Sequence, residues 1–175
     1  MKNINFDSDK DFETRAKVFN NKMLKLNLAD PNLVIKCSKK EIEKLEQDNN
    51  VIFPKSYRVF LEKFGHGLGG SIMKEIDILY DNIFNLTNVI RNEVLIDEGD
   101  PVLPNKAFVF IRYNEQFMFF NADGLEEEPS VFYYMINDKE FIKIADSIFD
   151  IVEDEVEQAR SIKHYREQNK KTDKN

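Results

Sequence analysis

The sequence predicts an α+β fold, in which a central, mainly antiparallel sheet of about four to six strands in a meander is flanked by N-terminal helices and a long C-terminal helix. Two observations support this prediction. Apolar residues recur at three- and four-residue spacing near both ends of the 175-residue chain, as on the buried face of a helix. Short runs rich in Phe, Tyr and Val fill the middle of the chain, and such runs favour strands.

Two helices are predicted before residue 50. The first covers residues 10–28 and ends at Ala29-Asp30-Pro31-Asn32, which contains a turn-forming proline. Ser38 and Glu41 form a capping box at the start of the second helix, because each side chain can satisfy the other residue's backbone N–H. Asp48-Asn49-Asn50 ends this helix.

A third helix begins at Pro54, which suits a first turn because its missing N–H costs nothing there. Its buried stripe consists of Tyr57, Phe60, Leu61 and Phe64, and it stops at Gly65.

The segment from Gly65 to Gly70, GHGLGG, satisfies the spelling G-x-G-x-x-G of a dinucleotide-binding loop. Such a loop must follow a strand and open a helix, whereas this one follows a helix and precedes a predicted strand. We therefore expect Gly65 to be a helix C-cap in the left-handed conformation. Gly67, Gly69 and Gly70 are expected to form a flexible connection into the sheet.

The middle of the chain predicts one further helical stretch, from Ile83 to Val94, with Asp81 or Asn82 as its cap. Strands are predicted from alternating or short apolar runs: residues 71–80, 107–113, 116–122 and 130–136, and a short edge strand at Ile142 and Ile144. Asn114-Glu115 and Asp123-Gly124 are the turns of the meander. Because both faces of these strands are apolar, we expect the sheet to be covered on both sides.

A second capping box, Ser147 and Asp150, is predicted to begin the last helix. Beyond Ile162 the chain loses its apolar residues, so we expect residues 161–175 to form a polar, flexible tail. Residues 1–36 are expected to be a helical N-terminal extension, which leaves residues 37–160 as the main domain.

Composition excludes several classes of function. The formal net charge is −7, and this argues against a nucleic-acid binder, whose phosphate contacts need a basic face. The single cysteine, Cys37, excludes an internal disulfide, and no signal peptide or run of about 20 apolar residues is visible. We expect a soluble, cytoplasmic protein that binds neither membrane nor nucleic acid.

Residues that could perform catalysis or bind a metal are few. His66 and His164 are the only histidines; we expect His66 in a solvent-facing loop near helix carbonyls and His164 in the polar tail. Cys37 is expected to be half-buried, with a thiol that the nearby helix N-terminus could acidify. One cysteine and two separated histidines fall short of a usual zinc ligand set. The sequence therefore predicts no catalytic residue, no metal site and no cofactor.

Three acidic clusters are the most conspicuous charged features. Asp97, Glu98 and Asp100 form the first; Asp123, Glu126, Glu127 and Glu128 form the second; Asp150, Glu153, Asp154, Glu155 and Glu157 form the third. The first two lie in predicted loops and the third extends along a predicted helix. Such clusters are usually a solvated face. The functional alternative is an acidic surface that attracts a basic protein partner.

The order of motifs resembles the SUKH superfamily, which is named partly for the fungal Smi and Knr cell-wall regulators and includes many bacterial immunity proteins. The resemblance covers about Ser38 to Val156. The family's L-P-x-x-Y-x-x-F-L is similar to F-P-K-S-Y-R-V-F-L, which contains Pro54, Tyr57, Phe60 and Leu61, with Phe53 in place of the usual Leu. An acidic turn followed by Pro-x-Val-Tyr resembles E-E-E-P-S-V-F at residues 126–132.

The resemblance implies a cytoplasmic, non-enzymatic immunity protein that binds and neutralises a cognate toxin domain, such as a basic nuclease. The first two acidic clusters are then the candidate contact residues. An alternative is an intracellular regulatory or scaffold protein of the Smi/Knr type. An acidic hydrolase or nucleotide-binding enzyme has the least support. Exposed apolar residues on an edge strand could also pair two copies into a homodimer.

Overall fold

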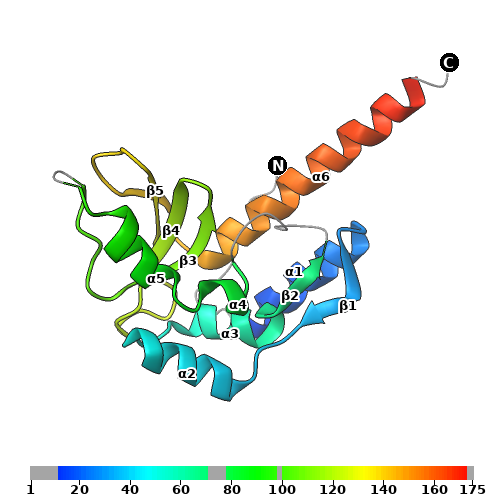
Figure 1. The fold of residues 1–175 in the computed structure, drawn as a ribbon. Coiled ribbons are helices and arrows are strands. Elements are labelled where there is room, and N and C mark those ends of the chain that lie inside the picture. Colours follow the sequence, from blue (N-terminus) through cyan, green and yellow to red (C-terminus); the bar gives the residue numbers. More distant parts are fainter. Residues whose placement is uncertain (1–11, 71–77, 98–99, 173–175) are drawn as a thin grey trace.

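The computed structural model describes residues 12–70, 78–97 and 100–172, and it confirms the α+β class (Figure 1). The elements in chain order are α1 (Phe12–Lys25), β1 (Ala29–Ile35), α2 (Lys39–Asn49), α3 (Lys55–Phe64), β2 (Gly67–Gly70), α4 (Tyr80–Ile83), α5 (Leu86–Val89), a π-helical turn (Ile90–Val94), β3 (Ala107–Tyr113), β4 (Gln116–Asn121), β5 (Val131–Met135), β6 (Ile142–Ala145) and α6 (Ile148–Thr172). Within these ranges every helix is too short or too polar to cross a bilayer.

The main sheet has the strand order β3-β4-β5-β6 and is antiparallel throughout, which confirms the predicted meander. In the first hairpin Tyr113 pairs with Gln116, and Asn114 in the turn takes a φ of 52°. β6 lies at one edge of the sheet, and its Ile142 and Ile144 side chains are exposed. The pairing of two copies of the chain through this edge stays a prediction.

Both faces of the main sheet carry buried aromatic side chains, as its apolar strands predicted. Tyr57 of α3 lies at the centre of the cluster on one face; its ring centroid is 4.9 Å from that of Phe120 and 5.7 Å from that of Phe108. On the other face, Phe119 of β4 and Tyr134 of β5 pack with Phe141 at ring-centroid distances of 4.8 and 5.5 Å. Successive side chains of a strand point to opposite faces, so the two clusters sandwich the sheet.

The motif residues of α3 form the centre of this core. Pro54, Tyr57, Phe60 and Leu61 are all buried, and Pro54 is the residue just before the helix rather than its first turn. α2 begins with the predicted capping box of Ser38 and Glu41 and ends at Asn50 in the left-handed conformation.

The predictions for the first turn after α1 and for the glycine segment were wrong, because the two segments pair as the antiparallel strands β1 and β2. A Cβ on Gly67 would lie 2.4 Å from the Leu33 carbonyl oxygen, and one on Gly69, whose φ is +90°, would lie 2.3 Å from the Ala29 Cβ. The backbones approach too closely for side chains at these positions, so glycines here build a strand instead of a flexible connection.

Gly65 follows α3 as predicted, but its φ of −56° is right-handed, so the predicted left-handed cap was wrong. The reason for a glycine is steric. A Cβ at Gly65 would lie 2.2 Å from the Cys37 Sγ and 2.7 Å from the Leu61 carbonyl oxygen. The Cys37 thiol therefore occupies the space that a side chain at residue 65 would need.

The predicted strand at residues 71–80 lies mostly outside the described residues, and its last residue, Tyr80, begins α4 instead. The expected helix from Ile83 to Val94 is divided among α4, α5 and the π-helical turn, and Leu79 rather than Asp81 or Asn82 precedes it. Thr87 of α5 accepts a hydrogen bond from the Val109 N–H at 3.0 Å. This bond satisfies a donor at the free edge of β3.

α6 is longer than predicted and continues beyond Ile162 to Thr172, projecting away from the body (Figure 1). Ser147 caps it, because its Oγ accepts a hydrogen bond from the Phe149 N–H at 3.0 Å. The second capping box was wrong, since the Asp150 carboxylate accepts from Arg15 of α1 instead. α1 also packs on α3, where the rings of Phe19 and Phe64 lie 5.3 Å apart.

Candidate partner-binding surface

Asp97 and Asp100 of the first acidic cluster are joined by two hydrogen bonds and lie between apolar side chains that face solvent. The Asp100 N–H donates to the Asp97 carbonyl at 3.1 Å, and the Asp97 N–H donates to the Asp100 carboxylate at 3.0 Å. Ile96 and Val102, on either side of this pair, are 65% and 89% exposed. Glu98 lies outside the described residues.

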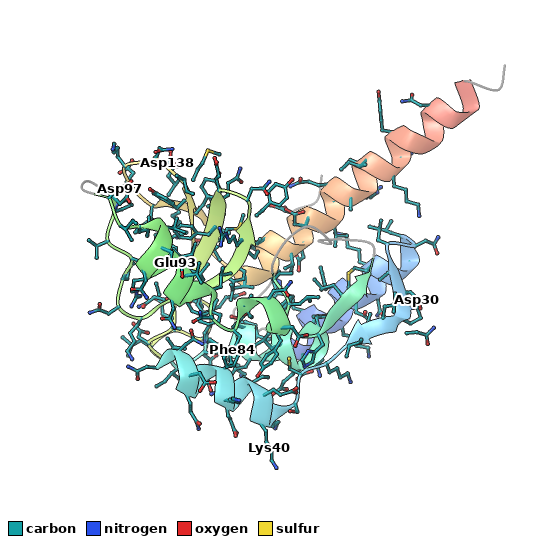
Figure 2. The ribbon with its side chains drawn as sticks, viewed as in Figure 1. Asp30, Lys40, Phe84, Glu93, Asp97 and Asp138 are labelled. Atoms are coloured by element: carbon teal, nitrogen blue, oxygen red, sulfur yellow. The ribbon has the colours of Figure 1, made fainter. Side chains whose placement is uncertain are left out.

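Asp138 joins this cluster from the turn after β5, although the sequence did not single it out. The Asp138 carboxylate accepts a hydrogen bond from the N–H of Met135, the residue after Tyr134, at 3.2 Å. Burial, with the negative charges of Asp100 and Asp138, raises the pKa of the Tyr134 hydroxyl. Figure 2 shows Asp97 and Asp138 at the same end of the molecule. We call Ile96, Asp97, Asp100, Val102 and Asp138 patch A.

The second cluster lies on the turn that follows β4. The Asp123 carboxylate accepts a hydrogen bond from the Leu125 N–H at 2.9 Å, and Gly124 between them has a φ of +79°. This turn directs Leu125 into solvent, where it is 84% exposed beside Ile52, which is 57% exposed.

Two neighbouring glutamates complete the second surface. Glu126 is exposed and forms no ion pair or hydrogen bond with the described residues, whereas the Glu127 carboxylate lies 4.0 Å from the Lys55 Nζ. We call Ile52, Asp123, Leu125, Glu126 and Glu127 patch B.

Patches A and B lie at opposite ends of the main sheet. Patch B follows Asn121, which pairs with Ala107 at one end of the β3–β4 hairpin. Asp138 of patch A follows β5, whose Tyr134 pairs with Phe117 near the other end. Asp123 of patch B is six residues from Phe117 along the chain, and since a strand rises about 3.3 Å per residue, the two acidic surfaces are roughly 20 Å apart.

Glu128 does not belong to either surface, because it binds Arg15 inside the molecule. The Arg15 side chain is only 11% exposed, and its Nη1 lies 3.0 Å from the Glu128 Oε1. The Ser147 hydroxyl donates to the same carboxylate. Glu128 therefore holds α1 near the start of α6 and is a poor candidate for partner contact.

The third acidic cluster, on α6, is only in part the solvated face that such clusters usually form, because several of its carboxylates bind cations of α1. Arg15 also binds Asp150 at 2.5 Å and Glu153 at 3.0 Å. Lys22, two turns further along α1, binds Glu157 at 2.6 Å. The acidic run of α6 is thus matched by cations of α1, a helix at the other end of the chain.

His66 is half-buried between two carboxylates, which corrects the prediction of a solvent-facing loop. Its Nε2 lies 3.1 Å from the Glu41 Oε1 and its Nδ1 lies 3.1 Å from the Asp81 Oδ2. Hydrogen bonds to these carboxylates, opposed by partial burial, raise the pKa of His66.

The Cys37 thiol is also different from its prediction. It is buried, and burial together with the charges of Glu41 and Asp81 raises its pKa to about 12, so it is not acidified by the helix N-terminus. A buried thiol of this kind is a poor nucleophile. Its sulfur nevertheless lies within 4.8 Å of donor atoms of both Glu41 and His66, so these three residues could hold a metal ion.

Sequence reasoning found the carboxylates of both patches but missed their exposed apolar residues and Asp138. A signal was present in each case: Ile96 and Val102 border an acidic, proline-containing loop, and Leu125 follows Asp-Gly. Apolar residues placed within turn motifs are those that a core cannot easily enclose.

A comparison with protein families identifies one match. Residues 36–154, more than half of the chain, match the model of the SMI1 / KNR4 family (SUKH-1). The match begins at the residue before Cys37 and ends within the buried half of α6. No curated protein matches the chain significantly.

Proposed function

The chain belongs to the SMI1 / KNR4 (SUKH-1) family, and from this premise we propose that it is a cytoplasmic immunity protein that binds a cognate bacterial toxin domain and neutralises it without catalysis. An immunity role fits the family in general. Because members of one fold family can bind different partners, we infer the kind of partner from the surface of this chain.

The observation that carries the proposal is the combination of exposed apolar side chains with carboxylates in patches A and B. Leu125 and Val102 are more than four-fifths exposed; Leu125 lies on a turn closed by Asp123, and Val102 follows the hydrogen-bonded pair Asp97 and Asp100. Interfaces typically bury a few large apolar anchors inside a polar rim. Leu125 beside Glu126 and Val102 beside Asp100 have this arrangement.

The acidity of both patches favours a basic partner. The protein carries a net charge of −7, and a nuclease toxin needs a basic groove to hold its substrate's phosphates. A standard interface covers about 800 Å² on each partner, equivalent to a disc about 30 Å across. One toxin domain could therefore cover both patches and block the groove.

Rescue from a candidate toxin domain, chosen from the genes that neighbour this one, is the direct test. Cells that express the toxin domain should survive only when this protein is co-produced, and the two proteins should co-elute as a complex. If no complex forms and growth is not restored, the immunity proposal fails, and the regulatory or scaffold alternative gains support.

Charge reversal can locate the contact surface. We expect Glu126→Lys with Glu127→Lys to slow association by about 10-fold or more at low salt, and less at high salt, without lowering stability. Glu128 is left unchanged because its loss would weaken the fold. Asp154→Lys, on an exposed position of α6, is the matched control and should bind as the wild type does. An unchanged association rate for the double variant would place the contact elsewhere.

A further inference from the structure

Cys37, Glu41 and His66 come from two segments, the start of α2 and the residues between α3 and β2, and meet beside the end of α3. Cys37 precedes the capping residue of α2, Glu41 lies in the first turn of α2, and His66 precedes β2. One donor atom from each, the Sγ, a carboxylate oxygen and an imidazole nitrogen, lies within 4.8 Å of the other two. We propose that these residues bind a zinc ion, with water as the fourth ligand.

The chemistry of the three donors suits zinc. Zn²⁺ binds thiolate, imidazole and carboxylate at about 2.3, 2.0 and 2.1 Å respectively, and three protein ligands with one open position form a common set. In a tetrahedral site these bond lengths place neighbouring donors about 3.3–3.6 Å apart. The Nε2 of His66 and the Oε1 of Glu41 are already 3.1 Å apart, so small side-chain movements suffice.

Groups around the three ligands hold them in place. The Asp81 Oδ2 lies 3.1 Å from the Nδ1 of His66, which leaves Nε2 directed at Glu41. This carboxylate–histidine pairing is the usual support of a zinc-bound imidazole. The second oxygen of Glu41 accepts a hydrogen bond from the Ser38 N–H at 2.6 Å, so Oε1 remains available.

Backbone hydrogen bonds also hold the segments that carry the three donor residues. The Cys37 N–H donates to the Leu61 carbonyl at 3.0 Å, and the His66 N–H donates to the Ile35 carbonyl at 3.0 Å. The Tyr80 N–H, next to Asp81, donates to the Gly65 carbonyl at 2.7 Å. The segments that carry the donors are therefore organised without the metal, which lowers the cost of binding.

Metal binding must displace two protons. The Cys37 thiol loses its proton to become a thiolate, and the imidazolium of His66 loses its Nε2 proton, while its Nδ1 keeps a proton and donates it in a hydrogen bond to Asp81. Both protons go to solvent, and the charges of the thiolate and of Glu41 neutralise the Zn²⁺. Among the described residues, Asp81 and the Tyr80 hydroxyl, which donates to the Glu41 carbonyl, are further titratable groups at the site. Affinity should therefore rise steeply with pH.

Cobalt and zinc titrations of the full chain test the site. With Co²⁺ we expect a sulfur-to-cobalt charge-transfer band and the intense visible bands of four-coordinate cobalt, both lost when Zn²⁺ is added. Cys37→Ser should abolish the charge-transfer band, and His66→Gln should weaken zinc binding by more than about 100-fold. Asp81→Asn should weaken it by about 10-fold or more. His164→Gln, at the other histidine, is the matched control.

Calorimetry completes the test, because it does not depend on the spectrum. Zinc binding should release protons at about pH 7.5, as measured in two buffers of different ionisation enthalpy. Each variant is first checked by circular dichroism, and Asp81→Asn changes an exposed side chain, so it keeps the test valid if Cys37→Ser fails to fold. Absence of binding by the wild type, or equal affinity of the wild type and His66→Gln, would overturn the proposal.

Discussion

Replacement of Arg15 by Met should destabilise the protein strongly, because one guanidinium binds three carboxylates from two distant segments. The variant keeps an unbranched side chain against the Phe149 ring, which lies 5.3 Å from the Arg15 Cζ. It leaves Glu128, Asp150 and Glu153 without their cation and close to one another. The experiment therefore isolates the charge from most of the packing.

The magnitude follows from the exposure of the partners. A buried hydrogen bond to a charged group contributes about 1.5–3 kcal/mol, and removal of one partner of a fully buried ion pair costs about 3–5 kcal/mol. Here the three carboxylate side chains are 25%, 44% and 33% exposed, so water replaces part of what is lost. We expect the free energy of unfolding to fall by about 2–4 kcal/mol.

Urea unfolding followed by circular dichroism measures this loss. Added salt, at about 0.5 M, should recover part of the loss because it screens the repulsion among the three carboxylates. Lys22→Met is the matched control on the same helix. It removes a single exposed pair with Glu157, so it should cost less than about 1 kcal/mol. A loss below about 0.5 kcal/mol for Arg15→Met would refute the reasoning.

Two further predictions concern the segment around Gly65. Gly65→Ala should lower the free energy of unfolding by about 1–3 kcal/mol, because its Cβ would overlap the Cys37 Sγ, and Cys37→Ala in the same chain should recover part of it; an unchanged midpoint in urea would contradict the steric argument. Because the pKa of His66 is raised, its contribution is present below the unfolded value of about 6.5 and is lost as pH rises through the folded value. With EDTA present, His66→Gln should therefore cost more stability at about pH 5.5 than at about pH 8.5, and equal costs would rule out the ionic contact with Glu41.

Local patterns were sufficient to predict most of the fold. The spacing of Tyr57, Phe60 and Leu61 predicted a helix whose apolar face lies in the core, and the four strands of the main sheet follow the predicted runs. These elements are stabilised mainly by burial of apolar side chains, and the spacing of those side chains along the sequence directly indicates a helix or a strand. Capping by Ser38 and Glu41 was predictable for the same reason, since both partners lie within one turn.

The remaining features depend on contacts between distant segments. β1 contains Pro31 and β2 contains three glycines, so neither resembles a strand until the two backbones meet. The partners of Arg15 lie more than 110 residues away along the chain. Nothing local distinguishes a carboxylate that binds an arginine from one that faces water, and for this reason Glu128 was assigned to the contact surface.

The far half of α6 has a practical use. From Val156, a buried residue after which the α6 side chains of known burial are only partly buried or exposed, the chain continues in helical form to Thr172 and points away from the loops that carry patch A (Figure 1). At 1.5 Å per residue this is a rod about 24 Å long. A fluorophore or surface anchor attached near its end would sit well clear of the acidic patches. Sensor-based measurements could then immobilise the protein there and leave the candidate toxin-contacting surface unobstructed.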